Sequence, residues 1–221
     1  MLQFFSRYKF FAIVLLILSV IIITVIYTIL KPVKILPVYQ PNDVNAELVD
    51  TTIQYVKKYH TIADFKLTNQ NGKTITQQDY ANKIYVADFF FTTCQTICPV
   101  MTNHMAEIQE ELYNDEEVLL LSHTVMPETD TVAQLKKYAL EKGVNDAKWN
   151  LVTGDKKQIY DLARKSYLAA KDNPYQKSDL IHTENFVLVD TKKRIRGFYD
   201  GTDPLAIETL LEDIQTLKKE E

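Results

Sequence analysis

The sequence predicts an α/β domain, in which helices flank a mixed β-sheet, after one N-terminal transmembrane helix. Three observations carry this prediction. An uncharged run of 21 residues, Phe10 to Leu30, lies near the N-terminus. Strand-like and helix-like segments alternate along the rest of the chain, which is typical of a sheet with helices on its faces. The chain then ends on two strand-like segments and a helix, an order that favours a mixed sheet over a purely parallel one.

The composition indicates a folded chain and gives no reason to expect a nucleic-acid partner. Of the 221 residues, 46% are hydrophobic and 24% are charged, values that are typical of globular proteins rather than disordered ones. The formal net charge is −4 and no stretch is strongly basic, so the chain lacks the electrostatic footprint of a nucleic-acid binder. The length suits one domain of ordinary size plus additional segments.

The apolar run is long enough to cross a membrane, because a spanning helix needs about 20 apolar residues. The main alternative is a cleaved signal peptide, which ends at a small-residue site. The residues after the run, Lys31-Pro32-Val33, offer no such site, so we expect a retained anchor. A buried core helix is a third and poorer alternative. Basic residues flank both ends of the run, so the positive-inside rule does not orient it.

The expected organisation has four parts. Residues 1–9 are a short flank, 10–30 the transmembrane anchor, 31–58 a juxtamembrane linker, and 59–221 the α/β domain. Prolines in the linker oppose helix formation and favour an extended chain. They are Pro32, Pro37 and Pro41.

The domain is expected to open with a β-hairpin. The segment 64–68 alternates polar and apolar residues, Asn71-Gly72 is a strong turn signal, and 73–76 continues as a second strand. The next segment, Ile84 to Phe91, is nearly continuous and apolar, which predicts a central strand buried on both faces. From Pro99 the spacing of apolar residues changes to that of a helix.

The remaining segments continue the alternation. We expect a second buried strand, a helix that Gly143 closes, a short strand, a second helix, two paired strands and a final helix. In that order they are 118–122, 131–142, 149–154, 155–168, 185–190, 194–199 and 204–218.

The only two cysteines, Cys94 and Cys98, stand between the central strand and the helix that follows it, which is the layout of a thioredoxin-like fold. At a helix N-terminus, backbone N–H groups and the helix dipole favour the thiolate, the form that attacks disulfides and binds metals. The Cys-x-x-x-Cys spacing lets both sulfurs face one point, where two soft thiolates suit Cu(I). Thiol–disulfide exchange and a structural disulfide remain alternatives on the residues alone.

Two sulfurs make an incomplete site for Cu(II) or Zn(II), so a third ligand is sought among the four histidines. His60 precedes the domain's first elements, and His104 falls well off the Cys98 face of the helix. His123 ends the second buried strand, where it is expected near the C-terminal edge of the sheet. His182 lies in a loop just before a late strand, where thioredoxin-like folds approach the cysteine loop. Spacing alone does not select His182, because a lone loop histidine is usually solvated.

Three segments of the chain carry a family resemblance. An apolar strand leads into Thr-x-Cys-x-x-x-Cys-Pro at Thr92 to Pro99. The segment Thr124 to Thr131 contains Pro-Glu-x-Asp-Thr, and a His-Thr pair at His182 precedes a strand that ends in Asp190. In this order on an anchored chain, they resemble the Sco/SenC family of membrane-tethered copper proteins over roughly residues 60–218.

The resemblance implies copper binding through Cys94, Cys98 and His182. It also implies delivery of copper, or of reducing equivalents, to the binuclear copper site of cytochrome c oxidase, so the expected partner is the oxidase subunit that holds this site. The family's domain faces the periplasm or the mitochondrial intermembrane space. No mitochondrial presequence precedes the anchor, so we expect a single-pass protein of the bacterial inner membrane with its domain on the periplasmic side.

The chain departs from the family pattern at three positions. Many members carry an acid after Cys-Pro and another before the histidine, where this chain has Val100 and Ile181. Both changes remove negative charge, which weakens Cu(II) more than Cu(I). Met126 replaces an aspartate, and packing explains it better than a thioether near copper. Separately, Asp88 lies inside the apolar strand, where a carboxylate is costly unless paired or protonated; a bond to a neighbouring hydroxyl is favoured over tuning of Cys94.

The leading hypothesis is therefore a copper-binding assembly factor, a metallochaperone rather than an enzyme. The alternative is a thiol–disulfide oxidoreductase in which Cys94 and Cys98 cycle and His182 is dispensable. A peroxidase of the thioredoxin superfamily is disfavoured because no arginine lies near Cys94 in the sequence. A binding module with a structural disulfide is the non-chemical alternative.

Overall fold

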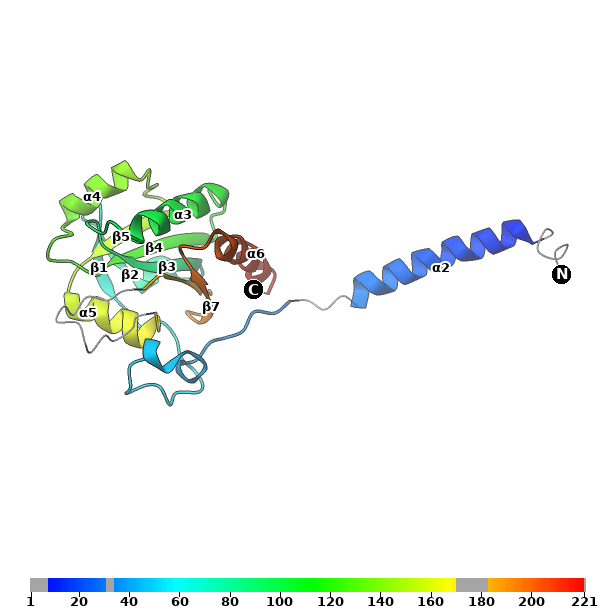
Figure 1. Cartoon of the computed structure of the whole chain (residues 1–221), viewed down its shortest axis with the longest axis horizontal. Helices are drawn as coiled ribbons and strands as arrows, with labels where there is room; N and C mark the ends of the chain where they lie inside the picture. The colour runs from blue at the N-terminus through cyan, green and yellow to red at the C-terminus, as the bar shows by residue number, and fades with distance from the viewer. Residues whose placement is uncertain (1–7, 31–33, 170–182, 221) are drawn as a thin grey trace. The chain divides into compact units, whose positions relative to one another are not determined.

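The computed structural model describes residues 8–30, 34–169 and 183–220, and it divides the chain into two units, Met1–Ile35 and Leu36–Glu221 (Figure 1). In the first unit, α2 (Lys9–Leu30) is one continuous helix. Its stretch Lys9–Tyr27 is long and apolar enough to cross a membrane, and none of it is buried in the structure. The N-terminal helix expected from the apolar run is therefore confirmed as a helix.

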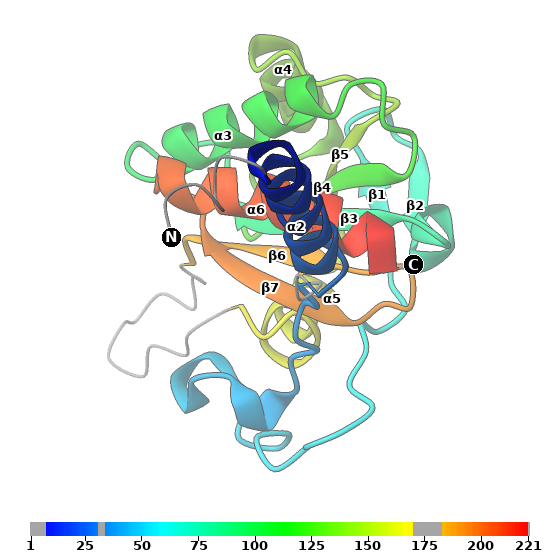
Figure 2. The ribbon, with the colours of Figure 1, turned by 90° about the vertical axis from the view of Figure 1, so that its right-hand side faces the viewer.

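The second unit is built on a mixed sheet, which confirms the predicted architecture. Among the described residues the sheet has seven strands in the order β2-β1-β5-β4-β3-β6-β7 (Figures 1 and 2). The β3–β4 and β4–β5 pairs are parallel and the other neighbours are antiparallel. The strands are β1 (Lys66–Asn69), β2 (Thr74–Thr76), β3 (Ile84–Phe90), β4 (Val118–Thr124), β5 (Trp149–Thr153), β6 (Asn185–Val189) and β7 (Ile195–Asp200).

Helices cover both faces of this sheet (Figure 1). One face packs against α3 (Cys98–Glu111), α4 (Val132–Glu141) and α6 (Pro204–Glu220), and the other packs against α5 (Lys156–Asp161) and the π-helix η4 (Leu162–Ser166). Three short 3-10 helices lie outside the two layers: η1 (Pro41–Asp43), η2 (Ala46–Leu48) and η3 (Gln77–Tyr80).

Strand β3 supplies side chains to both cores, and all seven of its residues are buried. Tyr85, Ala87 and Phe89 join the α5-side core, whereas Val86 and Phe90 join the α3-side core. This alternation follows from the two-residue period of a strand. The α3-side core also contains Met101, Met105, Ile108, Leu135 and Ile214, and the α5-side core also contains Phe65, Ile159, Leu162 and Tyr167. The prediction of a central strand buried on both faces is therefore confirmed.

The predicted hairpin is also present. Strands β1 and β2 pair antiparallel, with Thr68 opposite Thr74. In the loop between them, Gly72 takes a φ of 74°, a left-handed conformation that glycine adopts without the steric cost of a side chain. The side-chain oxygen of Asn69 accepts hydrogen bonds from the backbone N–H groups of Asn71 and Lys73. These bonds close the loop and fix the register of the two strands.

The helix expected over 155–168 is shorter than predicted. Its α-helical part ends at Asp161, and η4 continues it as a π-helix to Ser166. Leu168 then takes a φ of 53°, which an α-helix does not accommodate, and the fully buried side chains of Tyr167 and Leu168 pack into the α5-side core. Tertiary packing therefore overrides the helical period in this segment.

Candidate functional site

The two cysteines lie where β3 ends and α3 begins. Phe90 is the last residue of β3, the loop 91–97 follows, and Cys98 is the first residue of α3. Pro99 occupies the first turn of the helix, where its missing N–H leaves no intrahelical bond unmade. Since β3 and β4 are parallel, the loop stands at the C-terminal edge of both strands. The predicted position of the pair at a strand-to-helix junction is confirmed.

The two thiols differ in exposure. Both cysteines are free, with Cys94 half-buried and Cys98 buried. The sulfur of Cys94 lies 3.5 Å from the hydroxyl oxygen of Thr96, and its backbone N–H donates to the carbonyl of Phe91 at 3.3 Å. Cys98 packs within the α3-side core. The sequence predicted two accessible thiolates, but the structure presents only one sulfur to a partner and keeps the other beneath it.

The same asymmetry separates the pKa values of the two thiols. Partial burial alone would raise the pKa of Cys94, but hydrogen bonds from the Cys98 thiol and from Thr96 lower it to about 7. Burial raises the pKa of Cys98 to about 12, and the hydrogen bond to Cys94 acts in the same direction. Near neutral pH, Cys94 is therefore the thiol that ionises more readily, and Cys98 keeps its proton.

Asp130 holds the cysteine loop against the end of β4. Its fully buried carboxylate accepts hydrogen bonds from the Thr92 backbone N–H at 3.1 Å, the Thr92 hydroxyl at 2.6 Å and the Thr124 hydroxyl at 2.5 Å. The Gln134 side-chain amide donates to the Thr92 hydroxyl oxygen at 3.1 Å. Thr92 stands two residues before Cys94, so this network sets where the loop leaves the sheet.

Sequence reasoning missed this network, although a signal for it was present. Thr92 and Asp130 each follow the end of one of two neighbouring strands, and the segment Thr124 to Thr131 belongs to the family pattern. Polar residues that follow adjacent parallel strands meet at one edge of the sheet. The identity of the bonded pairs depends on the tertiary packing.

Asp88 lies under the loop on the α3 side of β3. It is 1% exposed, and burial raises its pKa to about 7, although a hydrogen bond with Ser122 partly offsets the increase. The Trp149 indole N–H also donates to the Ser122 hydroxyl oxygen at 2.8 Å. The hydrogen bond between Asp88 and Ser122 supports the interpretation that Asp88 bonds a neighbouring hydroxyl. Its charge also contributes to the raised pKa of Cys98, though less than burial does.

Of the three described histidines, His60 and His104 bond backbone carbonyls, and His123 is buried without a hydrogen-bond partner in the described part of the chain. A ring nitrogen of His60 lies 2.7 Å from the Ser166 carbonyl oxygen, and one of His104 lies 2.7 Å from that of Gly201. His123 is fully buried in the α5-side layer, stacked on Phe89, and burial lowers its pKa to about 3. No group of three metal-binding side chains occurs among the described residues.

The predicted third ligand, His182, lies outside the described residues, so its position relative to the two cysteines is not part of the structure. Met126 is described, and it packs against the α5-side core, whereas Cys94 packs against the α3-side core. That placement supports packing as the role of the Met126 side chain.

Comparison with known proteins gives consistent matches. A family model described as SCO1/SenC matches residues 53–219. A SCO1/SenC family lipoprotein from Bacillus anthracis is 30% identical, with 72% of this chain and 95% of that chain covered and a TM-score of 0.65. BsSco, described as a member of the Sco family of cytochrome c oxidase assembly proteins with a disulfide switch, is 31% identical, with 72% and 93% covered and a TM-score of 0.61.

A third solved structure is more distant. Arabidopsis thaliana ScoI with copper bound is 24% identical, with 72% of this chain and 98% of that chain covered and a TM-score of 0.58. At that identity the likeness shows the fold alone. Taken together, these matches confirm the predicted thioredoxin-like fold.

Proposed function

The chain belongs to the SCO1/SenC family, and from that premise we propose that it is a membrane-anchored copper chaperone for the binuclear copper site of cytochrome c oxidase. The observation that carries the proposal is the asymmetric sulfur pair. Cys94 is half-buried beside the loop surface, and Cys98 lies beneath it at the first residue of α3. BsSco, which is 31% identical, belongs to a family of oxidase assembly proteins, and that supports the same role here.

The chemistry of the pair suits Cu(I) as cargo. Two thiolates are soft ligands, which Cu(I) prefers over harder oxygen donors. Binding requires both sulfurs to be deprotonated, and Cys94 meets this condition near neutral pH because its pKa is about 7. Cys98 has a pKa of about 12, so the metal must displace its proton. Loading therefore releases a proton from Cys98 and becomes tighter as pH rises.

His182 completes the proposed ligand set. The resemblance to the family assigns it that role, whereas one ring nitrogen of His60 and one of His104 bond backbone carbonyls elsewhere. A neutral imidazole is compatible with two thiolates around Cu(I) and raises affinity without closing the site. The described residues near the cysteines add no carboxylate ligand. With Val100 and Ile181 in place of acids, the site favours Cu(I) over Cu(II).

Release follows from the exposure of Cys94. An incoming thiolate from the oxidase subunit can approach the copper from the side of the half-buried sulfur, since Cys98 shields only the inner side. Ligand exchange then proceeds one sulfur at a time: a bond to the incoming thiolate forms, and the bond to Cys94 breaks. A closed site with four protein ligands would block that approach.

The proposed function is tested in cells that depend on this chain for oxidase assembly. Membranes from cells with Cys98→Ser are expected to contain oxidase protein that lacks its binuclear copper site, as measured by optical and electron paramagnetic resonance spectra. Thr93→Ser, an exposed loop variant, serves as the matched control. Full copper-site content in the Cys98→Ser cells at limiting copper would refute the chaperone role.

A thiol–disulfide oxidoreductase is the second candidate. The low pKa of Cys94 and the high pKa of Cys98 support it, because one thiol then attacks first and the other second. In that reaction the Cys94 thiolate attacks a target disulfide and expels one target thiolate, and Cys98 then loses its proton and attacks the mixed disulfide. The target gains two electrons and the Cys94–Cys98 pair becomes a disulfide. BsSco is described as having a disulfide switch. A His182→Ala protein that keeps full activity in cells would favour this candidate over the chaperone.

The proposed location is the bacterial inner membrane, with α2 as a single-pass anchor and the domain on the periplasmic side. The Bacillus anthracis relative is a lipoprotein, and a lipid anchor of that kind is attached to a cysteine. Both cysteines of this chain, Cys94 and Cys98, lie at the sulfur site instead. The apolar stretch Lys9–Tyr27 is therefore the proposed means of attachment. The chain should stay in the membrane pellet after alkaline carbonate extraction, and a membrane-impermeant maleimide should label Cys94 in spheroplasts. A soluble or unlabelled chain would contradict this placement.

A further inference from the structure

An exposed loop before β1, residues 55–59, carries two tyrosines and two lysines. Its sequence is Tyr55-Val56-Lys57-Lys58-Tyr59. Tyr59 is 92% exposed, Tyr55 is 74% exposed, and both lysines are exposed. Within the described part of the chain, none of these four side chains has a hydrogen bond, an ion pair or a ring contact. The segment that contains the loop, drawn in light blue to cyan, stands out from the sheet and α5 at the bottom of Figure 2.

The fold holds the 55–59 loop in a defined conformation. The Val56 carbonyl oxygen accepts a hydrogen bond from the Asn42 backbone N–H at 3.1 Å. The His60 backbone N–H donates to the Gln40 side-chain oxygen at 2.9 Å. Between these two bonds Tyr59 takes a φ of 66°, a left-handed conformation that a bulky residue rarely adopts. Such a backbone persists only where the surrounding contacts fix it, so the fold itself keeps the Tyr59 ring in solvent.

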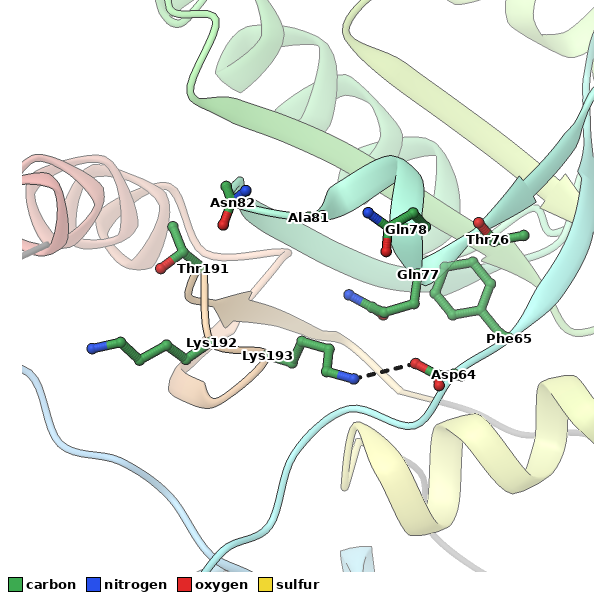
Figure 3. Close-up of a pocket in the computed structure, with 10 residues that line it drawn as sticks. All are labelled: Asp64, Phe65, Thr76, Gln77, Gln78, Ala81, Asn82, Thr191, Lys192 and Lys193. Carbon is green, nitrogen blue, oxygen red and sulfur yellow. Dashed lines mark hydrogen bonds and ion pairs between the residues drawn. The ribbon is translucent and has the colours of Figure 1, made fainter.

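The loop carries a positive charge that its own segment does not balance. No acidic residue occurs from position 51 to position 63. The acids on either side of this stretch have cationic partners elsewhere. Asp50 lies 4.0 Å from the Lys165 ammonium, and Asp64 lies 3.2 Å from the Lys193 ammonium, as the dashed line in Figure 3 shows. The two lysines of the loop therefore give the segment a net charge of +2 beside two exposed aromatic rings.

We propose that the 55–59 loop contacts the headgroup region of a membrane that contains anionic lipids. Tyrosine suits a membrane–water interface because its ring is apolar and its hydroxyl group is polar. A lysine near an anionic leaflet is attracted by the negative surface potential. The proposal rests on the proposed membrane location, because an anchor raises the local concentration of the domain at the surface, where a contact too small to bind alone becomes occupied. The contact restricts the rotation of the domain over the membrane that holds the proposed oxidase target.

The test places a tryptophan reporter in the loop of the full-length chain, reconstituted into vesicles. Tyr59→Trp and Tyr55→Trp are the reporters, and Tyr113→Trp, at a tyrosine that is 63% exposed on another part of the domain, is the matched control. Trp149 is buried and adds the same background to every variant. The vesicles contain phosphatidylcholine with or without phosphatidylglycerol, and brominated acyl chains serve as the quencher. In the anionic vesicles, bromine should quench both loop reporters and leave the control unquenched.

The lysines are tested in the Tyr59→Trp chain. Lys57→Gln and Lys58→Gln should each shift the equilibrium between lipid-contacting and free loop about fivefold toward the free loop. Lys137→Gln, at an exposed lysine on α4, should leave this equilibrium unchanged. A rise in ionic strength should weaken the quenching, because salt screens the attraction between the lysines and the lipid.

Flotation of the chain with the vesicles reports the anchor separately from the loop. The proposal is overturned if the chain floats but the loop reporters are quenched no more than Tyr113→Trp, which is the result expected of a loop that binds an acidic protein instead. It is also overturned if phosphatidylglycerol makes no difference, or if Lys57→Gln and Lys58→Gln keep the full contact. Those outcomes leave the proposed anchor and copper chemistry intact, since no step of the test needs metal. A chain that does not float contradicts the anchor and the loop contact together.

Discussion

Replacement of Asp130 by asparagine tests whether a buried carboxylate holds the cysteine loop in place. Asp130 is fully buried and accepts three hydrogen bonds, two from Thr92 and one from Thr124. Asparagine has nearly the same shape but only one acceptor oxygen, so the change removes the charge and at least one of the three hydrogen bonds while the packing is kept. A hydrogen bond to a charged group contributes about 1 kcal/mol more than a neutral one, so three such bonds lose about 3 kcal/mol. The easier burial of a neutral amide offsets part of this loss, and we expect a net decrease of about 2 kcal/mol in the free energy of unfolding.

The same substitution should alter the sulfur site. Thr92 stands two residues before Cys94, and a loosened Thr92 releases the loop that brings the Cys98 thiol and Thr96 to the Cys94 sulfur. The rate of Cys94 alkylation by iodoacetamide should therefore titrate at a higher pH than in the wild type. Its midpoint should move from about 7 toward the ordinary thiol value. Guanidinium unfolding and pH-dependent alkylation of the full-length chain in detergent measure the two effects separately.

Asp155→Asn is the matched control for this experiment. Asp155 is an exposed aspartate that caps α5 by accepting a hydrogen bond from the Gln158 backbone N–H at 2.8 Å, and asparagine caps helices equally well. It should change the free energy of unfolding by no more than about 0.5 kcal/mol. The reasoning about the loop is refuted if Asp130→Asn matches this control in both stability and the alkylation midpoint.

Four further expectations follow from the same structure. In the wild type, carboxymethylation of Cys94 should accelerate as pH rises through about 7 while Cys98 stays unmodified, and equal rates for both thiols would contradict the asymmetry. Burial lowers the pKa of His123 from its ordinary 6.5 to about 3, so between these pH values the unfolded chain binds a proton that the folded chain does not, and the wild type loses up to about 1.4 kcal/mol of stability per pH unit as the pH falls. In His123→Phe this loss should be absent. Urea unfolding at pH 7 and pH 5 measures the difference. Arg196 is 3% exposed and bonds Asp190, Glu220 and the Leu36 and Pro37 carbonyls, so Arg196→Met should lower the free energy of unfolding by about 3–5 kcal/mol, and a loss below 1 kcal/mol would be inconsistent with that role. Met126→Leu should leave Cu(I) affinity unchanged and cost less than about 1.5 kcal/mol in chemical unfolding, whereas weaker copper binding would place the thioether at the metal.

Local patterns predicted most of the fold because they report periodicity and turn chemistry directly. The continuous apolar run at Ile84 to Phe91 matched β3, since a strand covered on both faces has no polar side to show. Asn71-Gly72 matched the hairpin turn because the left-handed φ at Gly72 favours glycine. The segment 155–168 was predicted less well. There the buried Tyr167 and Leu168 bend the chain away from a regular helix, and no local pattern encodes that packing.

The site was predictable in its location but not in its internal chemistry. Residue types and spacing placed Cys94 and Cys98 at one junction, and the structure brings them there. The difference between the two thiols depends on Cys98 entering the α3-side core, which is a tertiary property. The bonds between Asp130 and Thr92 join residues 38 apart in the sequence, so spacing alone does not pair them. The role of His182 came from the resemblance and stays a prediction.

The most direct test of the central claim is the Cu(I) affinity of the reduced full-length chain, measured by competition with a chromophoric chelator. The wild type should bind one Cu(I) ion tightly. Cys94→Ser and Cys98→Ser should each lose at least about a hundredfold in affinity and His182→Ala about tenfold, whereas His104→Ala should match the wild type, because His104 bonds the Gly201 carbonyl instead. Unchanged copper binding in Cys94→Ser and Cys98→Ser, or equal losses in His104→Ala and His182→Ala, would contradict the proposed site.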